Sequence, residues 1–352
     1  MTSSNTSFDS IPGLPRLRRS AHRIAPAIGL AFLSPLVGEY LLGNTSIVAL
    51  VDIWFFLPIY GGGAVLIREI TRRSGRGWPT VLLLGSVFGV ILAGLIDHSL
   101  FHQDFQGRIV RSPAYIPAVG ISAENALVFV VGHVVWSIGI PILLVESFLP
   151  ERRTTPWIGK TGLVITGLLF LVFGTLLEYG IRLEEGFFPS TPQVVGTVIV
   201  AVVVSVVAFT ADGRFVGRND RQAPNPWVVG IVAFGASSLW MVRPDIVSVT
   251  TSALLIESVQ EWLAVAFGIL LIGAMILLIG SWSQRTDWGE IHRIALAGGA
   301  MLTYAWISFV LVPYGGVSKT VDLVGDVVFT LGAVLLIIVA ARRVRRTAEE
   351  KL

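Results

Sequence analysis

The chain has 352 residues, of which 53% are hydrophobic and only 14% are charged, and its formal net charge is +3. Soluble globular chains carry about 25% charged residues, so this composition and the mean hydropathy of +0.76 exclude an ordinary soluble protein and predict a polytopic membrane protein. Cysteine is absent, which excludes disulfides, thiolate metal sites and a cysteine nucleophile. No basic stripe interleaved with aromatic residues occurs, so we expect no nucleic-acid partner.

Apolar stretches of about 17–25 residues, long enough for a hydrocarbon core of roughly 30 Å, recur along the chain. Ten of them are found, at about 24–42, 47–67, 79–99, 126–147, 158–178, 193–210, 226–242, 260–280, 292–312 and 321–340. The sequence therefore predicts an all-α transmembrane helix bundle in the lipid bilayer. We expect a disordered tail (1–20), a single helical domain (21–341) with an irregular half (21–180) and a regular half (190–341), and a basic tail (342–352).

The basic residues alternate between loops in a way that predicts orientation. With the N-terminus in the cytoplasm, 21 of the 26 lysines and arginines fall on the inner side. The five that remain outside are Arg108, Arg111, Arg182, Arg243 and Lys319. Because cytoplasmic loops are enriched in Lys and Arg, we expect a cytoplasmic-membrane protein with both termini in the cytoplasm.

The first spans contain residues that interrupt a regular helix. Pro35, Pro58 and Pro141 lie inside spans one, two and four. Each internal proline frees the carbonyl four residues earlier, such as those of Ala31 and Ser137. In lipid such a carbonyl must be met by protein or by water in a cavity, so the irregular half is the expected seat of a functional site.

Ionisable side chains gather in or near the outer halves of the first five spans. They include Glu39, Asp52, Asp97, His98 and His133. A charged side chain at the centre of a membrane helix costs roughly 2.5–3.5 kcal/mol on insertion scales, so these residues are candidate ligand or proton sites. Positions close to helix ends, where the cost is small, are the alternative interpretation.

His133 and Ser137 are four residues apart and share one face of span four, beside the kink at Pro141. Ser137 is therefore a further candidate for the ligand or proton site. A histidine whose hydrogen bonds are met by a neighbouring helix is the alternative.

The stretch Leu92 to Arg108 holds two histidines with spacing typical of metal ligands. His98 and His102 are four residues apart and could share a metal if the helix continues past Phe101 and if His133 or a carboxylate completes the set. Asp97 lies on the small-residue face of span three, which predicts that it points toward a neighbouring helix. The alternatives to a metal site are a proton or ligand site and the polar end of a helix.

The loop after span two is basic. We expect Arg68, Arg72, Arg73 and Arg76 to contact anionic lipid headgroups. No P-loop, GxSxG or HExxH motif occurs, so the sequence predicts no cofactor and favours a protein that is not an enzyme. It identifies no protein partner.

The segments PIYGGGAVLIREITRRSGRGWPTVLLLGSVFGVILAGLIDHSLF and HVVWSIGIPILLVESFLPERRTTPWIGKTG cover roughly residues 55–165. They resemble a family of uncharacterised actinobacterial multi-pass membrane proteins, which is faintly similar to the CPBP-type intramembrane proteases. Phe129 and His133 match the FxxxH element of that group, whereas its glutamate pair would fall at Leu92 and Ala93, where this chain has no acid.

Three functions remain open on these grounds. The first is a membrane protein with an outward-facing polar cavity that binds or transports a small solute or ion. The resemblance implies the second, a CPBP-like intramembrane hydrolase that uses His133 with Asp97 and His98. The third is a non-catalytic relative that acts as a membrane scaffold.

Overall fold

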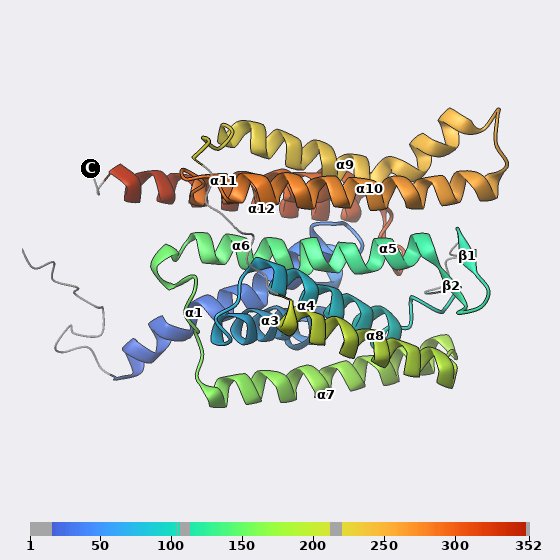
Figure 1. The fold of residues 1–352 in the computed structure, drawn as a ribbon. Coiled ribbons are helices and arrows are strands. Elements are labelled where there is room, and N and C mark those ends of the chain that lie inside the picture. The colour runs from blue at the N-terminus through green and yellow to red at the C-terminus, as the bar shows by residue number, and fades with distance from the viewer. Residues whose placement is uncertain (1–15, 104, 106–112, 212–219, 350–352) are drawn as a thin grey trace, which may run out of the picture.

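The computed structural model describes residues 16–103, 105, 113–211 and 220–349, which form a bundle of long, roughly parallel and antiparallel helices (Figure 1). The only strands among these residues are β1 (Tyr115–Ile116) and β2 (Ile121–Ser122), which pair antiparallel in a short hairpin. The predicted all-α bundle is therefore confirmed. Residues 1–15 of the expected N-terminal tail lie outside the described residues.

The first four spans are built from several short helical pieces. In chain order the pieces are α1 (Arg16–Pro35), η2 (Leu36–Tyr40), η3 (Ile47–Asp52), α2 (Ile53–Phe56), η4 (Leu57–Gly61), α3 (Gly62–Arg73), α4 (Trp78–Ile91), η5 (Leu92–Ile96), α5 (Ala123–Gly132), η7 (His133–Gly139) and α6 (Ile140–Ser147). Four of these pieces, η2, η4, η5 and η7, are π-helical. All four lie in the half of the chain where internal prolines predict irregular helices.

The later spans are continuous. After the short 3₁₀ turn η8 (Pro150–Arg152) they are α7 (Lys160–Glu185), α8 (Thr191–Thr210), α9 (Pro226–Thr251), α10 (Glu257–Ser283), α11 (Glu290–Ile307) and α12 (Lys319–Glu349). Several outlast the predicted spans: α7 continues to Glu185 and α9 to Thr251. The helix α12 continues to Glu349, through most of the segment that the sequence analysis assigns to a C-terminal tail.

Ten long helical segments thus lie where the ten apolar stretches predict them, and eight are long and apolar enough to cross a membrane. Of the described segments, α1 with η2 and α11 are long enough but not apolar enough to be among the eight. The helix α11 is enclosed by α9, α12 and α6, and most of its side chains are buried. Because it contacts protein on most sides, it does not need the apolar surface of a lipid-facing helix.

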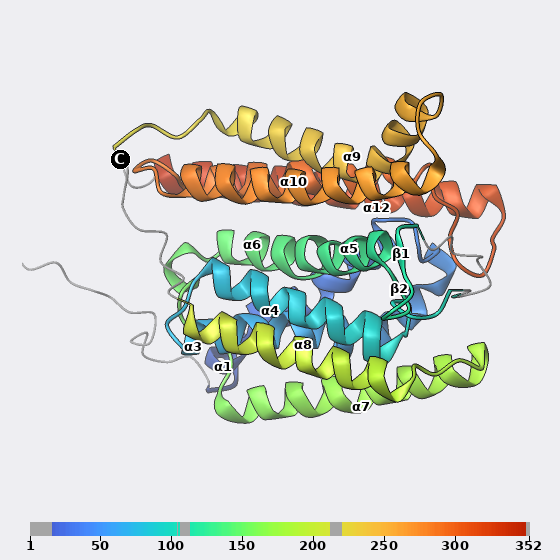
Figure 2. The same cartoon turned by 45° about the vertical axis from the view of Figure 1, so that its right-hand side comes forward.

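The helices are stacked in layers. Helices α9 to α12 make one layer, α5 and α6 run beneath it, and α1, α3, α4 and α8 follow, with α7 at the far edge (Figures 1 and 2). In the second, third and fourth spans, about half of the residues in the most apolar 18-residue stretch are buried inside the protein. In α7, α8, α9, α10 and α12 only 6–22% of such residues are buried. The irregular first half is therefore the centre of the bundle.

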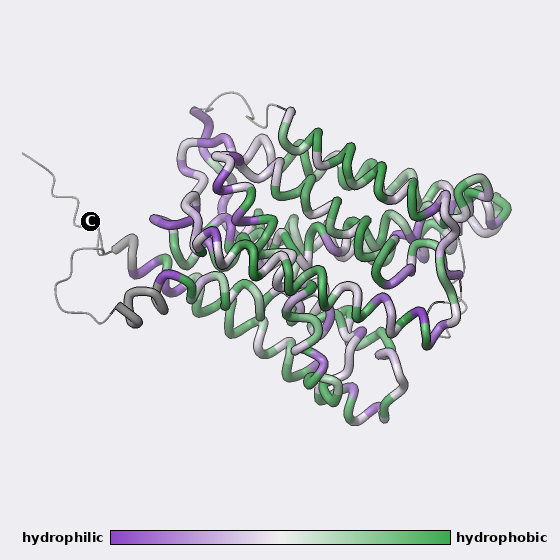
Figure 3. Tube along the Cα trace, turned by 90° about the horizontal axis from the view of Figure 1, so that it is seen from below, coloured by the Kyte–Doolittle hydropathy of each residue, from purple (hydrophilic) through white to green (hydrophobic). Residues whose placement is uncertain are grey.

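The two ends of the bundle differ in charge. One end, which we call the basic end, holds Arg72, Arg152, Arg285 and Arg342, and the opposite acidic end holds Asp97, Glu124, Glu185 and Glu257. Hydrophobic residues fill the helices between them, and the hydrophilic residues gather most densely near the C-terminus (Figure 3).

Two of the carbonyls that lose their helical hydrogen bond to a proline are contacted by a neighbouring helix. The Ser34 hydroxyl donates a hydrogen bond of 2.6 Å to the Ser137 carbonyl, which Pro141 leaves without its helical partner. The Ala31 carbonyl lies against Gly61, where a Cβ atom would come within 2.3 Å of the oxygen. Glycine is therefore required at position 61, and both contacts fix α1 against its neighbours.

Candidate functional site

Each of the four π-helical segments holds, or is directly followed by, one ionisable side chain of the first four spans. Glu39 lies in η2, Tyr60 in η4 and His133 at the start of η7, and Asp97 follows η5 directly. A π-turn adds one residue to a helical turn and is frequent at functional sites. The coincidence of four π-turns with four polar residues singles out this group, which we call the central cluster.

Within the central cluster the two carboxyl groups and a phenol interact. The Tyr60 phenol and the Asp97 carboxylate both lie close enough to Glu39 to act on it electrostatically. Tyr60 is 6% exposed, whereas Glu39 and Asp97 remain partly exposed. Water or a small ion can therefore reach the two acids although neighbouring helices surround them.

The central cluster has two acidic groups and no paired base. No lysine or arginine of the described residues pairs with Glu39 or Asp97; the Asp97 carboxylate accepts a 2.9 Å hydrogen bond from the backbone of Ser99. Two carboxylates that share a site repel one another, and in a membrane that repulsion is weakly screened. A proton or another cation between them is the arrangement that removes it.

His133 lies on the aromatic side of the central cluster. Its ring centroid lies 5.8 Å from that of Tyr60 and 5.8 Å from that of Phe88. Its Nδ1 lies 2.5 Å from the Phe129 carbonyl, and since a carbonyl only accepts, Nδ1 carries the proton and Nε2 of the neutral ring keeps a lone pair. The FxxxH spacing therefore corresponds here to a contact within one helix.

The other predicted members lie at the margin of this cluster. Ser137 is buried and packs against Gly38, where a Cβ atom would come within 2.5 Å of its hydroxyl oxygen. Asp52 is exposed at the start of α2 and makes no capping hydrogen bond there. Ser137 thus serves the contact between α1 and η7, and Asp52 lies apart from Glu39 and Asp97.

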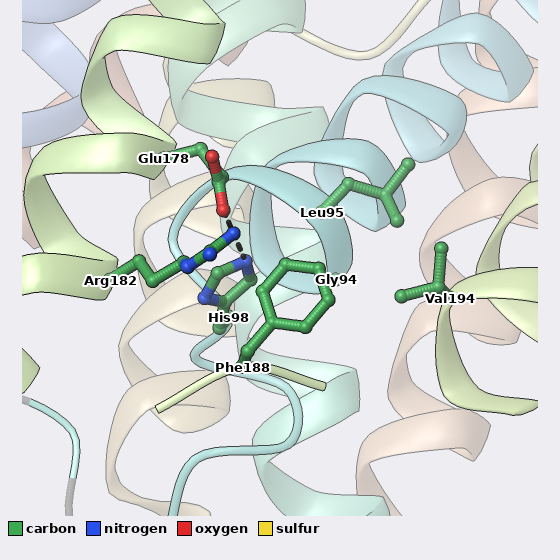
Figure 4. A pocket seen from close by; sticks show the side chains of 7 residues that line it. All are labelled: Gly94, Leu95, His98, Glu178, Arg182, Phe188 and Val194. Carbon is green, nitrogen blue, oxygen red and sulfur yellow. Dashed lines mark ion pairs between the residues drawn. The ribbon is translucent and has the colours of Figure 1, made fainter. Parts of the chain in front are cut away.

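His98 points away from its neighbour Asp97. Its φ of +60° is one that residues other than glycine seldom adopt, and it turns the imidazole toward α7. There Nε2 of His98 lies 3.9 Å from Oε1 of Glu178 (Figure 4). The single site predicted from Asp97 and His98 is therefore divided into two.

The three histidines of the predicted metal site do not meet. His102 lies 3.8 Å from Glu185, and its ring is tilted against that of Phe187 with centroids 4.4 Å apart, while His133 stays in the central cluster. Across the described parts of the chain, no three metal-ligating side chains are grouped closely enough to hold an ion. The helix ends at Ile96, so the four-residue spacing of His98 and His102 does not place them on one helical face.

A buried ion network at the basic end was not predicted from the sequence. Arg68 is fully buried, and its Nε donates to Glu146 over 3.0 Å while a second nitrogen donates to Glu69 over 2.8 Å. Arg72 donates to both oxygens of Glu146, over 2.9 and 2.7 Å. The Arg68 guanidinium also lies 3.2 Å from the ring centroid of Trp157. We call these five residues the basic-end network.

The basic-end network corrects the expectation for lipid headgroups. Arg68 and Arg72 are enclosed by protein, so their charges are used inside the molecule. Arg73 is exposed, contacts Glu69 at 3.5 Å and donates to the Ile158 carbonyl. Arg76 donates to the carbonyls of Phe209 and Ala211. Only Arg73 and Arg76 keep a surface that a headgroup could reach.

One sequence signal could have found this network. Glu146 follows residues 138–145 of span four, a run without polar side chains, and a lone acid after such a run requires a partner. The pattern of basic loops, which is read for orientation, conceals that some of those arginines are internal.

Comparison with known proteins gives a family and no activity. A family model described as an uncharacterized membrane protein family matches residues 29–346. No curated protein and no solved structure matches the chain.

Proposed function

The chain belongs to this uncharacterized membrane protein family, and from the geometry of its site we propose that it binds a cation, in the simplest case a proton, at Glu39 and Asp97. Ionisable residues inside a membrane protein mark ion or proton pathways more often than structural positions. The observation that carries the proposal is the grouping of two interacting carboxyl groups with Tyr60, with no lysine or arginine paired to either acid among the described residues.

The chemistry of the central cluster suits a small cation. Carboxylate and phenol oxygens are hard ligands, and a proton shared between the acids requires no further ligand. The lone pair on Nε2 of His133 gives a second place for a proton on the Tyr60 side of the cluster. Transport of a small solute coupled to this cation is the fuller form of the proposal.

The test uses the purified protein in lipid vesicles with a trapped pH indicator and a potassium–valinomycin potential. We expect potential-driven proton or sodium uptake, reduced about tenfold or more in Glu39→Gln and in Asp97→Asn. Asp52→Asn is the matched control, since it removes an exposed acid from the same end of the bundle and should keep the full rate.

Calorimetric titration with sodium chloride at several pH values accompanies the flux measurement. Equal cation binding in the unmodified protein, Glu39→Gln and Asp97→Asn would refute the proposal.

The hydrolase and scaffold alternatives have less support. His133 is flanked by Tyr60 and Phe88, and its ring is hydrogen-bonded to a carbonyl of its own helix. None of these contacts supplies the nucleophile that a hydrolase needs. A scaffold does not account for acids gathered at π-turns.

We also propose that the protein lies in the cell membrane with both termini at the cytoplasmic face. The support is the concentration of arginines at the basic end. Because the chain has no cysteine, single cysteines report orientation cleanly. In intact cells we expect an impermeant maleimide to label Ser318→Cys at the acidic end and to spare Thr154→Cys at the basic end; both positions are exposed. The reverse labelling would invert the proposed orientation.

A further inference from the structure

A second site lies outside the central cluster, between α7, α8 and the end of η5. It is a cavity of about 250 Å³ whose polar wall is formed by His98, Glu178 and Arg182 (Figure 4). Leu95, Phe188 and Val194 form its apolar wall. Typical small-molecule pockets measure about 300–1,000 Å³, so this cavity suits a group smaller than most such ligands.

The polar wall has unused hydrogen-bonding capacity. The His98 side chain is 2% exposed, and neither its Nδ1 nor the buried Oε1 of Glu178 makes a hydrogen bond among the described residues. The Leu95 carbonyl lies near the ring without hydrogen-bond geometry. The 3.9 Å between Nε2 of His98 and Oε1 of Glu178 is too long for a direct hydrogen bond. Buried polar atoms without partners are rare in proteins, which points to a ligand.

The polar wall carries one acidic and one basic side chain from the same helix. Glu178 and Arg182 are four residues apart on α7, and therefore lie on one face of that helix. The Arg182 guanidinium lies 5.0 Å from the ring centroid of Phe188 at the exposed rim. Burial lowers the pKa of the His98 imidazole below its usual value, with Glu178 opposing the shift. The cavity thus offers one negative and one positive group side by side.

The surroundings of the cavity are apolar and exposed. On α7, Tyr179 is 56% and Leu183 is 67% exposed, and on α8 Val195 and Val198 are exposed as well. Such a surface is covered by lipid tails in a membrane protein. The cavity opens beside it near the acidic end, next to the end of η5.

We propose that this cavity binds the headgroup of a zwitterionic phospholipid with a primary amine, such as phosphatidylethanolamine. Its ammonium donates to Glu178 and fills the gap beside His98, its phosphate pairs with Arg182, and its acyl chains cover the exposed side chains of α7 and α8. A quaternary ammonium has no N–H to donate, so the site prefers the primary amine over choline.

The experiment is native mass spectrometry of the full chain in detergent, titrated separately with phosphatidylethanolamine, phosphatidylcholine and phosphatidylglycerol. The unmodified protein should retain phosphatidylethanolamine most tightly. Glu178→Gln should weaken that binding about tenfold, to the level of phosphatidylcholine, and Arg182→Gln should weaken the binding of all three lipids.

Glu184→Gln is the matched control, because it removes an exposed acid from the same helix and should leave lipid retention unchanged. Soluble phosphoethanolamine forms a separate arm of the experiment. If it binds as tightly as the lipid, the site belongs to a free solute and the lipid proposal is overturned. Unaltered lipid preference in a folded Glu178→Gln protein would also overturn it.

Discussion

Replacing Glu146 by alanine is expected to lower the free energy of unfolding by about 3–5 kcal/mol, the cost of leaving a buried charge without its partner. Glu146 accepts hydrogen bonds from Nε of both Arg68 and Arg72 and a further bond from the end of Arg72. Because both guanidinium groups are buried, water cannot replace the lost carboxylate. Unfolding with SDS in mixed micelles, followed by tryptophan fluorescence, measures the change.

Glu151→Ala is the control for this prediction, since Glu151 lies at the same end and is exposed; it should change stability by less than about 0.5 kcal/mol. If the two variants unfold at the same SDS fraction, the network adds nothing to stability. The neighbouring pair of Arg153 with Glu290 extends the same network toward α11. Loss of Glu146 should therefore loosen contacts between the irregular half and the regular half.

A change of similar size is expected at the acidic end, where Glu124 at the start of α5 pairs with Arg243 of α9. The Arg243 nitrogen and the Glu124 oxygen are 2.5 Å apart. The Arg243 side chain is 1% exposed and the Glu124 side chain 7%. Glu124→Leu removes the only acid that contacts Arg243 in the described part of the chain, and should cost about 3–5 kcal/mol in the same SDS titration.

A double substitution separates charge from packing at this pair. When both partners become apolar, no charge is left buried, and such replacements are often neutral. Glu124→Leu with Arg243→Met should therefore recover most of the stability that Glu124→Leu loses. A double variant as unstable as the single one would show that packing around Trp240, whose ring centroid lies 3.7 Å from Arg243, dominates instead.

Arg243 also illustrates how internal ion pairs alter the interpretation of charged residues. The alternation of basic loops along the sequence predicts that Arg243 is one of five bases on the outer side. In the fold it is buried in α9, where it donates to the Trp240 carbonyl and contacts Glu124. It joins α9 to α5 and therefore acts within the protein.

The sequence by itself determines the all-α class and the positions of the spans, because hydropathy is a local property of about 20 consecutive residues. Pro35, Pro58 and Pro141 predict broken helices in the first half of the chain, and the π-turns of the described residues lie in that half. Placing an acidic side chain inside a membrane helix costs free energy whichever helices lie beside it. Glu39 and Asp97 could therefore be selected as candidates without a structure.

Only the tertiary structure decides which of those candidates share a site. Asp97 and His98 are adjacent in sequence, yet the backbone at His98 turns one toward Glu39 and the other toward Glu178. Arg68 meets Glu146 across 78 residues of chain. Such partners depend on which helices are neighbours and how they are rotated, and these are set by packing over the whole bundle, which no local pattern of residues records.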